Sequence, residues 1–370
     1  MWDPKKSESL KEEIMKDRIY VCHTYYHTYI SFLKELKIQD EEKDPGEATL
    51  VLSKMYNNFE KLGERILSTG VFKDVIEFDE KKDTEFPKLK KYKKNGGFIG
   101  NLVRRIIFTR KYAKCEAKYV PVDFKEYKNI YVYCDSDPIG TYLNMNRIYY
   151  HAVEDGLNCI ANCDMARVTN KGHFELKAAL SKKFNLIFVE NGYGKYCLDM
   201  EVNDISRIKY PCPYFKEVNR DETYVKRLTE TDKEKLLKAY VRDIDELNRQ
   251  IAETGDGAKI LLLTDPLCTL DVRKQIFTDL VERYSKEGRV FIKPHPRDAL
   301  DYKKEFPDVP SFDGTVPMEM LNFFPNLHFK KVVGVFTEMR AIAFADEVER
   351  LGSDFMDKYE APEAHRFNEI

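Results

Sequence analysis

The sequence predicts an α/β fold made of two Rossmann-like halves. Short, continuously apolar segments such as residues 19–22 and 259–263 alternate with stretches whose apolar residues recur at helical spacing. Strands of this kind are typical of parallel sheets covered by helices on both faces. The alternation is interrupted once, by a charged and proline-containing stretch within residues 205–255, and then resumes. A chain of 370 residues is long enough for two such domains.

In the first half, six segments rich in β-branched and aromatic residues are predicted to be strands. They are residues 19–22, 49–53, 74–78, 130–134, 150–154 and 185–189. The stretches between them predict a helix that begins after the first strand and ends near residue 36, and helices over 57–68, 98–114 and 142–150. We expect an N-terminal domain of residues 1–210.

The second half repeats the pattern. It predicts strands at 259–263, 289–292 and 331–335, and helices at 272–285, 317–322 and 337–351. Residues 223–254 are strongly charged with apolar residues at helical spacing, so we expect a helical linker at 211–255 and a C-terminal domain at 256–370. Ligands of such sheets bind outside the carboxyl ends of the strands. We therefore expect the two domains to face each other across a cleft.

Composition excludes several classes of protein. The 61 Lys and Arg residues nearly balance the 63 Asp and Glu residues, so no overall basic excess predicts a nucleic-acid partner. Hydrophobic residues make up 43% of the chain, which excludes general disorder. No apolar run reaches 18 residues, and the charged N-terminus does not resemble a signal peptide. We expect the eight scattered cysteines to be reduced, with neither disulfides nor a zinc site, in a cytoplasmic protein.

The first candidate site is Glu154-Asp155-Gly156, two adjacent acids that follow a predicted strand. A carboxylate held at the end of a strand can remove a proton from a substrate hydroxyl. The bland alternative is an ordinary Asp-Gly turn. The sequence does not say which of the two acids would point inward.

The second candidate is the segment Lys293-Pro294-His295-Pro296-Arg297, which follows a predicted strand. Two prolines flank the histidine and restrict the backbone on both sides, so His295 lies in a stiff loop. Lys293 and Arg297 add positive charge beside it. Such a loop suits an anion such as a phosphate, whereas the alternative is a histidine that is merely capped by a backbone carbonyl.

Two further candidates lie at predicted helix starts. Thr337 follows a strand, and a helix beginning there would combine a hydroxyl with free backbone N–H groups, which together favour an anion. Pro317 would place Glu319 in the first turn of its helix, where a carboxylate can bind ribose hydroxyls. The alternatives are a plain threonine N-cap and an acid that compensates the helix dipole.

Residues after two strands of the first half could line the cleft. Thr24, with its neighbours His23 and His27, follows the first strand, although a core or capping role is the stronger interpretation. Asp135-Ser136-Asp137 has the spacing of a nucleotide–metal motif but follows a strand of the first half, where a turn is the favoured interpretation. We predict no metal site and no cofactor.

Taken together, these motifs resemble the bacterial sialyltransferases, in particular the lipooligosaccharide sialyltransferase group (glycosyltransferase family 52) and the related capsular polysialyltransferases. The residues that carry the resemblance are the acidic pair with Gly156, the His-Pro of 295–296, the Pro-x-Glu of 317–319 and a strand that leads to Thr337. The opening Ile-Tyr-Val-Cys-His-Thr and the Leu-Leu-Leu-Thr-Asp-Pro-Leu that ends at Leu267 are similar as well. The resemblance runs in order over residues 19–345.

The resemblance implies a GT-B fold and a metal-independent, inverting transfer of sialic acid from CMP-sialic acid to a hydroxyl of a lipooligosaccharide or capsular glycan. Glu154 or Asp155 would be the general base. His295 would bind the phosphate of CMP and assist its departure. The further substrate-binding residues that we expect are Thr24, Asp135, Thr264, Lys293, Pro296, Arg297, Glu319 and Thr337.

The chain departs from the family pattern in two places. Glu338 stands where relatives often have a second hydroxyl, and Asp265 puts negative charge near the expected nucleotide. A CMP-Kdo or CDP-glycerol type of donor therefore stays open. So do a non-catalytic GT-B module that binds a nucleotide or glycan, and a sugar-nucleotide epimerase, which would need UDP and no acceptor.

Residues 86–114 carry ten Lys and Arg residues and no acid. The end of this segment is predicted to be an amphipathic helix, with Ile99, Leu102, Val103, Ile106 and Ile107 on its apolar side. A solvated basic face is the bland interpretation. The functional ones are peripheral contact with an anionic membrane and docking of an anionic glycan or glycolipid acceptor. Aromatic residues are not interleaved as a stacking platform, so nucleic acid is not expected. The chain could also form a homodimer.

Overall fold

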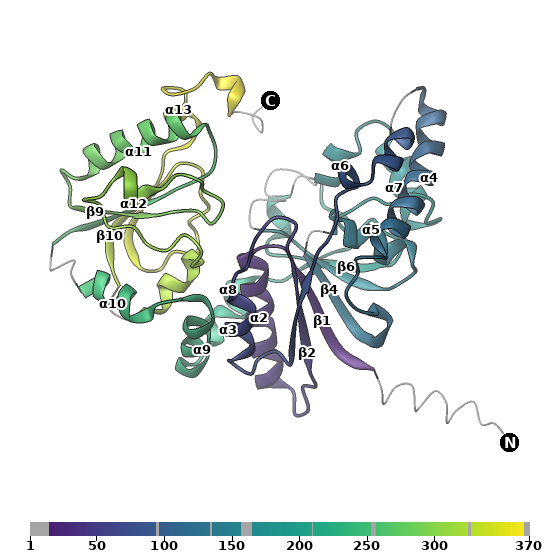
Figure 1. Ribbon diagram of the computed structural model, residues 1–370, viewed down its shortest axis with the longest axis horizontal. Coiled ribbons are helices and arrows are strands. Elements are labelled where there is room, and N and C mark those ends of the chain that lie inside the picture. Colours follow the sequence, from purple (N-terminus) through teal and green to yellow (C-terminus); the bar gives the residue numbers. More distant parts are fainter. Residues whose placement is uncertain are drawn as a thin grey trace. The chain divides into compact units, whose positions relative to one another are not determined.

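The computed structural model describes residues 15–93, 96–133, 135–156, 165–208, 210–252, 257–324 and 327–365. The chain divides into two compact units, Met1–Leu228 and Thr229–Ile370, and each has its own parallel sheet (Figure 1). The segment that the sequence analysis treats as a linker is divided between the units. Its first part ends the N-terminal unit, and its remainder begins the C-terminal unit with two helices.

The N-terminal unit contains a seven-stranded sheet with the order β3-β2-β1-β4-β5-β6-β7. All of its strand pairs are parallel, which agrees with the prediction. The strands are β1 (Lys16–Cys22), β2 (Ala48–Ser53), β3 (Asp74–Phe78), β4 (Tyr127–Tyr133), β5 (Tyr150–Val153), β6 (Cys197–Val202) and β7 (Phe215–Glu217). The helices of this unit are α2 (Tyr25–Glu41), α3 (Leu62–Leu67), α4 (Phe98–Glu116), α5 (Pro138–Met145), α6 (Met165–Thr169), α7 (Phe174–Lys182) and α8 (Arg220–Thr223).

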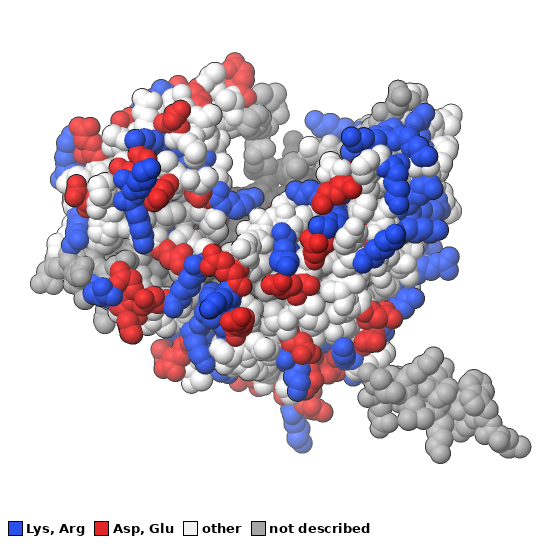
Figure 2. All heavy atoms as spheres, in the orientation of Figure 1, with Lys and Arg blue, Asp and Glu red and all other residues white. Residues whose placement is uncertain are grey.

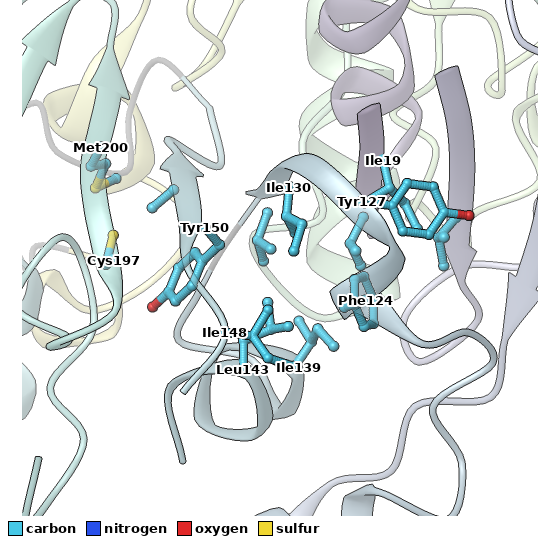
Figure 3. Packing of buried hydrophobic residues seen from close by; sticks show 14 of the residues in the cluster. Ile19, Phe124, Tyr127, Ile130, Ile139, Leu143, Ile148, Tyr150, Cys197 and Met200 are labelled. Atoms are coloured by element: carbon cyan, nitrogen blue, oxygen red, sulfur yellow. The ribbon is translucent and has the colours of Figure 1, made fainter. Parts of the chain in front are cut away.

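The core of this unit forms where one face of the central strands packs on α5. Ile19 and Ile130 from β1 and β4 lie in the same apolar cluster as Ile139 and Leu143 of α5, and all four are at least 98% buried (Figure 3). The other face of β1 is also buried, because its last five residues have almost no exposure. Burial on both faces explains why these strands are unbroken apolar runs in the sequence.

The sixth predicted strand is wrong. Residues 185–189 form no strand, although Ile187 and Val189 are fully buried in a cluster with α6 and α7. The position beside β5 is taken by β6, with Tyr150 opposite Cys197 and Ala152 opposite Met200. A short apolar run indicates burial but does not identify its hydrogen-bonding partner, and that ambiguity produced the error.

The C-terminal unit contains a four-stranded parallel sheet with the order β11-β10-β8-β9. Its strands are β8 (Lys259–Leu263), β9 (Arg289–Lys293), β10 (Phe329–Gly334) and β11 (Ala345–Arg350). Its helices are α9 (Glu230–Tyr240), α10 (Ile244–Ala252), α11 (Leu270–Tyr284), α12 (Tyr302–Glu305) and α13 (Gly352–Met356), with a 3₁₀ helix at Met318–Phe323. A cluster that joins β8, β9, β10 and α11 forms the core, with Ile260, Leu262 and Ile292 fully buried.

The helix predicted at 337–351 is also wrong, because these residues form a loop followed by the edge strand β11. Three ionic contacts favour the strand. Lys331 of β10 lies 3.4 Å from Glu347 and 3.7 Å from Glu349 across the pair, and Arg283 of α11 lies 3.3 Å from Glu349. Tertiary partners of this kind override a helical sequence pattern.

Five of the eight cysteines lie in the described part of the chain, and all five are free thiols. Four of them are buried, as expected for core residues, and Cys268 is partly exposed. Cys134, Cys159 and Cys163 lie outside the described residues. None of the described helices is both long and apolar enough to cross a bilayer.

Candidate active site

The candidate residues of the N-terminal unit follow the carboxyl ends of neighbouring strands. His23 follows β1, Glu80 follows β3, Asp137 follows β4 and Asp155 follows β5. Because the strands are parallel, these ends meet at one edge of the sheet, which is where ligands of α/β sheets bind.

Asp155 and His27 form a charge-assisted pair at this edge. His27 Nε2 lies 2.6 Å from Asp155 Oδ1, and His27 Nδ1 accepts a hydrogen bond of 3.0 Å from the backbone N–H of His23. The imidazole proton therefore lies on Nε2 and is donated to the carboxylate. Burial lowers the pKa of His27, although the contact with Asp155 opposes the shift, so the ring is neutral near pH 7. Its ring also stacks on Tyr133 at 4.7 Å, which fixes its orientation.

The two adjacent acids differ sharply in their surroundings. The side chain of Asp155 is 47% exposed, so a substrate can reach its carboxylate. Glu154 is 1% exposed, and its carboxylate lies 3.1 Å from the buried guanidinium of Arg220. Arg220 also donates to the Glu154 carbonyl at 3.3 Å and to the Tyr26 hydroxyl. These contacts favour Asp155 as the reactive acid and Glu154 as a structural one.

A second histidine, His23, holds the neighbouring loops together. Its Nε2 lies 2.6 Å from Glu80 and 3.5 Å from Asp137, and Glu80 also accepts from Ser53 and from the backbone N–H of Ile139. Burial alone would lower the pKa of His23, but the carboxylates of Glu80 and Asp137 outweigh it and raise the pKa to about 9. His23 is therefore positively charged at neutral pH.

The charge on His23 predicts a pH-dependent stability. Because its pKa rises from an ordinary 6.5 to about 9, the stabilisation is complete below about pH 6.5 and is lost as the pH rises through 9. The shift corresponds to about 3 kcal/mol. We expect the free energy of unfolding, measured by urea at several pH values, to fall over this window in the wild type. The fall should be smaller in His23→Gln, and an equal fall in both proteins would contradict the assignment.

Two residues expected to bind substrate have other partners. The Thr24 hydroxyl caps α2 by accepting from the backbone N–H of His27 at 3.2 Å, which is the capping role that the sequence favoured. Asp135 is 1% exposed and accepts from the Tyr150 hydroxyl and from the backbone N–H of Asn191. Burial raises the pKa of Asp135 to about 7. These contacts give both residues a structural task.

In the C-terminal unit, His295 lies in the loop after β9, as expected. Its backbone N–H donates to the Thr264 hydroxyl at 2.9 Å, and its Nδ1 accepts from the backbone N–H of Arg297 at 3.1 Å. The imidazole proton is therefore on Nε2. Burial lowers the pKa of His295 to about 4, and the positive charges of Arg297 and Lys293 add to this shift.

Buried groups beneath His295 fix this loop. Thr264, which follows β8, donates its hydroxyl to Asp298 at 2.6 Å while it accepts from His295. Asp298 also pairs with the buried Arg273 and accepts from the Tyr302 hydroxyl. Thr264 is 2% exposed, so it supports the loop through these hydrogen bonds from a buried position. The side chains of Pro296 and Arg297 are exposed.

Lys293 borders a pocket of about 510 Å³ beside this loop. Its ammonium donates to the carbonyls of Pro294 and Gly314, and burial lowers its pKa to about 8. Arg242 and Asp313 also line the pocket and lie 3.5 Å apart. The volume is large enough for a nucleoside. Sequence reasoning missed Arg242 and Asp313, because neither belongs to a recognisable motif.

Thr337 does not stand at a helix start, because the predicted helix is absent. Its hydroxyl donates to Asp265 at 2.7 Å, and the backbone N–H of Phe336 donates to the same carboxylate at 3.2 Å. Burial raises the pKa of Asp265, and these hydrogen bonds oppose the shift. The donors expected to bind a phosphate are thus directed to a carboxylate of the chain. Glu319 lies in the first turn of its 3₁₀ helix, after Pro317, as expected.

The comparisons with known proteins agree with this architecture. The sialyltransferase from Photobacterium damselae, solved as its GT-B domain, matches with a TM-score of 0.52 at 11% identity, over 90% of this chain and 89% of that one. The α/β-galactoside α-2,3-sialyltransferase from Photobacterium phosphoreum matches with a TM-score of 0.49 at 14% identity, over 87% and 86% of the two chains. The fold is GT-B.

The family follows from the sequence match. The family model of Glycosyltransferase family 52 matches residues 72–345, so the chain belongs to that family, as its motifs indicated. An uncharacterised protein from Haemophilus influenzae is 31% identical over 112 residues. That match spans 29% of this chain and about a third, 35%, of the relative's length.

Proposed function

We propose that this glycosyltransferase moves sialic acid from CMP-sialic acid to a hydroxyl of a surface glycan, with inversion and without a metal ion. Membership of family 52 supports the class of reaction. The observation that carries the chemistry is the exposed carboxylate of Asp155, held by the neutral imidazole of His27 at the carboxyl edge of the sheet. This geometry suits a general base.

In the proposed reaction, the acceptor hydroxyl loses its proton to Asp155 as its oxygen attacks the anomeric carbon of the donor. The bond from that carbon to the phosphate oxygen of CMP breaks, and its electron pair leaves with the phosphate. Attack on the face opposite the leaving group inverts the anomeric centre. His27 holds the carboxylate of Asp155 in place through Oδ1, and this carboxylate accepts the proton.

We propose that the C-terminal unit binds the donor. The Nε2–H of His295 would donate to the departing phosphate, where a fixed donor stabilises the growing negative charge. The pocket beside Lys293 would hold the nucleoside. The ribose contact of Glu319 and the phosphate contact of Thr337 stay predictions, and the latter requires Thr337 to exchange its bond with Asp265 for one with the ligand.

A thermal-shift comparison of CMP, CDP, UDP and GDP tests the donor class. We expect CMP to raise the melting temperature and UDP and GDP to leave it unchanged. A shift with CDP as large as with CMP would favour a CDP-glycerol type of donor, and a shift with UDP alone would favour an epimerase. CMP binding with no transfer to any glycan would instead identify a binding module and overturn the proposal.

We propose that the acceptor binds beside α4. A pocket of about 780 Å³ is walled by aromatic side chains, among them Phe98, Phe108 and Phe188, and by cations that include Arg105. It reaches Ser136, at the carboxyl end of β4, close in sequence to Asp137 of the candidate active site. Aromatic walls with a few polar groups suit a glycan or glycolipid.

The outer face of α4 supports the proposed contact with an anionic membrane. Ile99, Val103 and Ile107 recur one helical turn apart and are 75%, 50% and 37% exposed. Figure 2 shows Lys and Arg side chains gathered over the part of the molecule where Figure 1 draws α4. Apolar residues flanked by cations are typical of interfacial helices.

Sedimentation with vesicles tests this contact, which should require an anionic lipid. A cytoplasmic location and a homodimer stay predictions.

A further inference from the structure

A third pocket, of about 620 Å³, lies near the amino ends of strands β5 and β6 of the N-terminal sheet. Arg147 and Lys195 line it and precede β5 and β6, whereas Asp155 follows β5. Eight residues separate Arg147 from Asp155, which corresponds to roughly 26 Å of extended chain. This pocket is therefore separate from the candidate active site.

The charged side chains that line this pocket are all positive. Arg110 and Lys114 at the end of α4 face it together with Arg147 and Lys195, and no acidic side chain lines it. Within the described part of the chain, none of the four cations pairs with a carboxylate. Arg110 donates to the carbonyl of Ile106 and Lys195 to that of Lys183. Four cations around one hollow repel each other, and an anion with several charges would relieve that repulsion.

Aromatic rings stand beside these cations. Phe184 is 63% exposed and lines the pocket with Tyr196, whose ring packs edge-on against the exposed Tyr149 at 5.2 Å. Exposed aromatic faces next to charged groups suit a ligand that has both an apolar face and ionic substituents, as a sugar ring with acidic groups does.

The backbone around the pocket is unusual as well. Arg147 has φ of 60° and Asn185, which also lines the pocket, has φ of 52°. Asparagine adopts this left-handed region readily, but arginine does so at a cost. Backbone strain of this kind concentrates at binding sites, where it positions a side chain. Here it places the guanidinium-bearing residue at the rim of the pocket.

We propose that this pocket binds an acidic saccharide that carries at least two phosphate or carboxylate groups. Within the proposed function, on which this part rests, the ligand is an inner, charged segment of the acceptor, several sugar units from the hydroxyl that receives the sialic acid. A concave pocket with aromatic walls fits a sugar better than a flat bilayer surface. The membrane contact proposed for α4 is instead made by its exposed apolar face, which carries Ile99, Val103 and Ile107.

Titration calorimetry on the full chain tests this binding without any need for turnover. The probe is glucose 1,6-bisphosphate, with glucose as the neutral control. We expect the double variant Lys114→Gln/Lys195→Gln to bind the probe about tenfold more weakly or worse, since two charge-assisted contacts are lost. The matched control is Lys43→Gln/Lys61→Gln, which removes the same charge from exposed positions elsewhere in the same unit. It should bind like the wild type.

Three outcomes would overturn the proposal: no binding of the bisphosphate, equal binding of glucose, or equal weakening in both double variants. A further arm uses vesicles of phosphatidylcholine with and without phosphatidylglycerol. Suppose that the pocket variant, Lys114→Gln/Lys195→Gln, loses vesicle binding and that the wild type does not bind the bisphosphate. The site then recognises lipid headgroups, and the saccharide proposal is wrong.

The acceptor role has a separate measurement. With a long phosphorylated acceptor, the pocket variant should show a KM about tenfold higher and an unchanged kcat, and with lactose both proteins should transfer alike. An unchanged KM for the long acceptor would refute the acceptor role. Failure of the wild type to transfer to any acceptor would refute the proposed function and leave the calorimetric result standing.

Discussion

Asp155→Asn should lower the rate of transfer by about 10²–10⁴-fold, the range that a general base contributes. The amide keeps the shape of the side chain and its contact with His27 but cannot accept the proton of the acceptor hydroxyl. CMP affinity, measured by calorimetry, should stay the same, because the donor is proposed to bind in the other unit. The stability should also change little, since the side chain is half exposed.

The matched control is Glu154→Gln, one residue earlier in the chain. This change leaves the buried guanidinium of Arg220 without its carboxylate, and breaking such a pair typically costs about 3–5 kcal/mol. We expect a lower free energy of unfolding with a nearly normal kcat per folded molecule. The opposite pattern, with activity lost in the folded Glu154 variant and kept in Asp155→Asn, would exchange the roles of the two acids.

His295→Ala should lower the rate of transfer by about 10²–10³-fold, as the loss of one fixed donor to a developing anion does, and should weaken CMP binding. His295→Gln restores a side-chain N–H donor, so it should recover part of the CMP affinity. His328→Ala removes an exposed histidine that pairs with Asp346 in the same unit, and it should behave like the wild type. Unchanged activity in the alanine variant at 295 would refute the phosphate role.

The same residue gives a spectroscopic prediction. Its pKa of about 4 reflects burial and two neighbouring cations, so the free protein has a neutral imidazole at pH 7. A bound phosphate adds negative charge next to Nε2 and should raise that pKa, which a histidine NMR titration with and without CMP would detect. A pKa that CMP does not move would place the phosphate elsewhere.

The sequence predicted the strands best where both faces are buried. Each of the strands β1, β2, β8, β9 and β10 contains a run of buried residues, and each was placed to within about three residues. Residues 185–189 are similarly apolar but form no strand, and residues 337–351 have helical spacing but form a loop and the strand β11. In both cases, partners distant in sequence decided the structure.

The candidate site shows the same division between local and distant information. The motifs predicted the acidic pair Glu154-Asp155 and His295, because each follows a strand and has a distinctive neighbour. The contact that separates Asp155 from Glu154 comes from His27, 128 residues earlier in the chain. Glu80 likewise could be assigned to the candidate site only from its contact with His23 in the structure. The acid after β3 was a usable signal, but only the sheet order shows that β3 and β5 end at the same edge.

The acidic strand β11 has a consequence for self-association. It forms one border of the C-terminal sheet and carries the exposed Asp346 and Glu347 and the partly buried Glu349. If a second molecule added its own β11 alongside, the two rows of carboxylates would repel each other, as charged border strands generally do. Any homodimer of this enzyme should therefore form through another surface, and a continuous intermolecular sheet through β11 is disfavoured by charge.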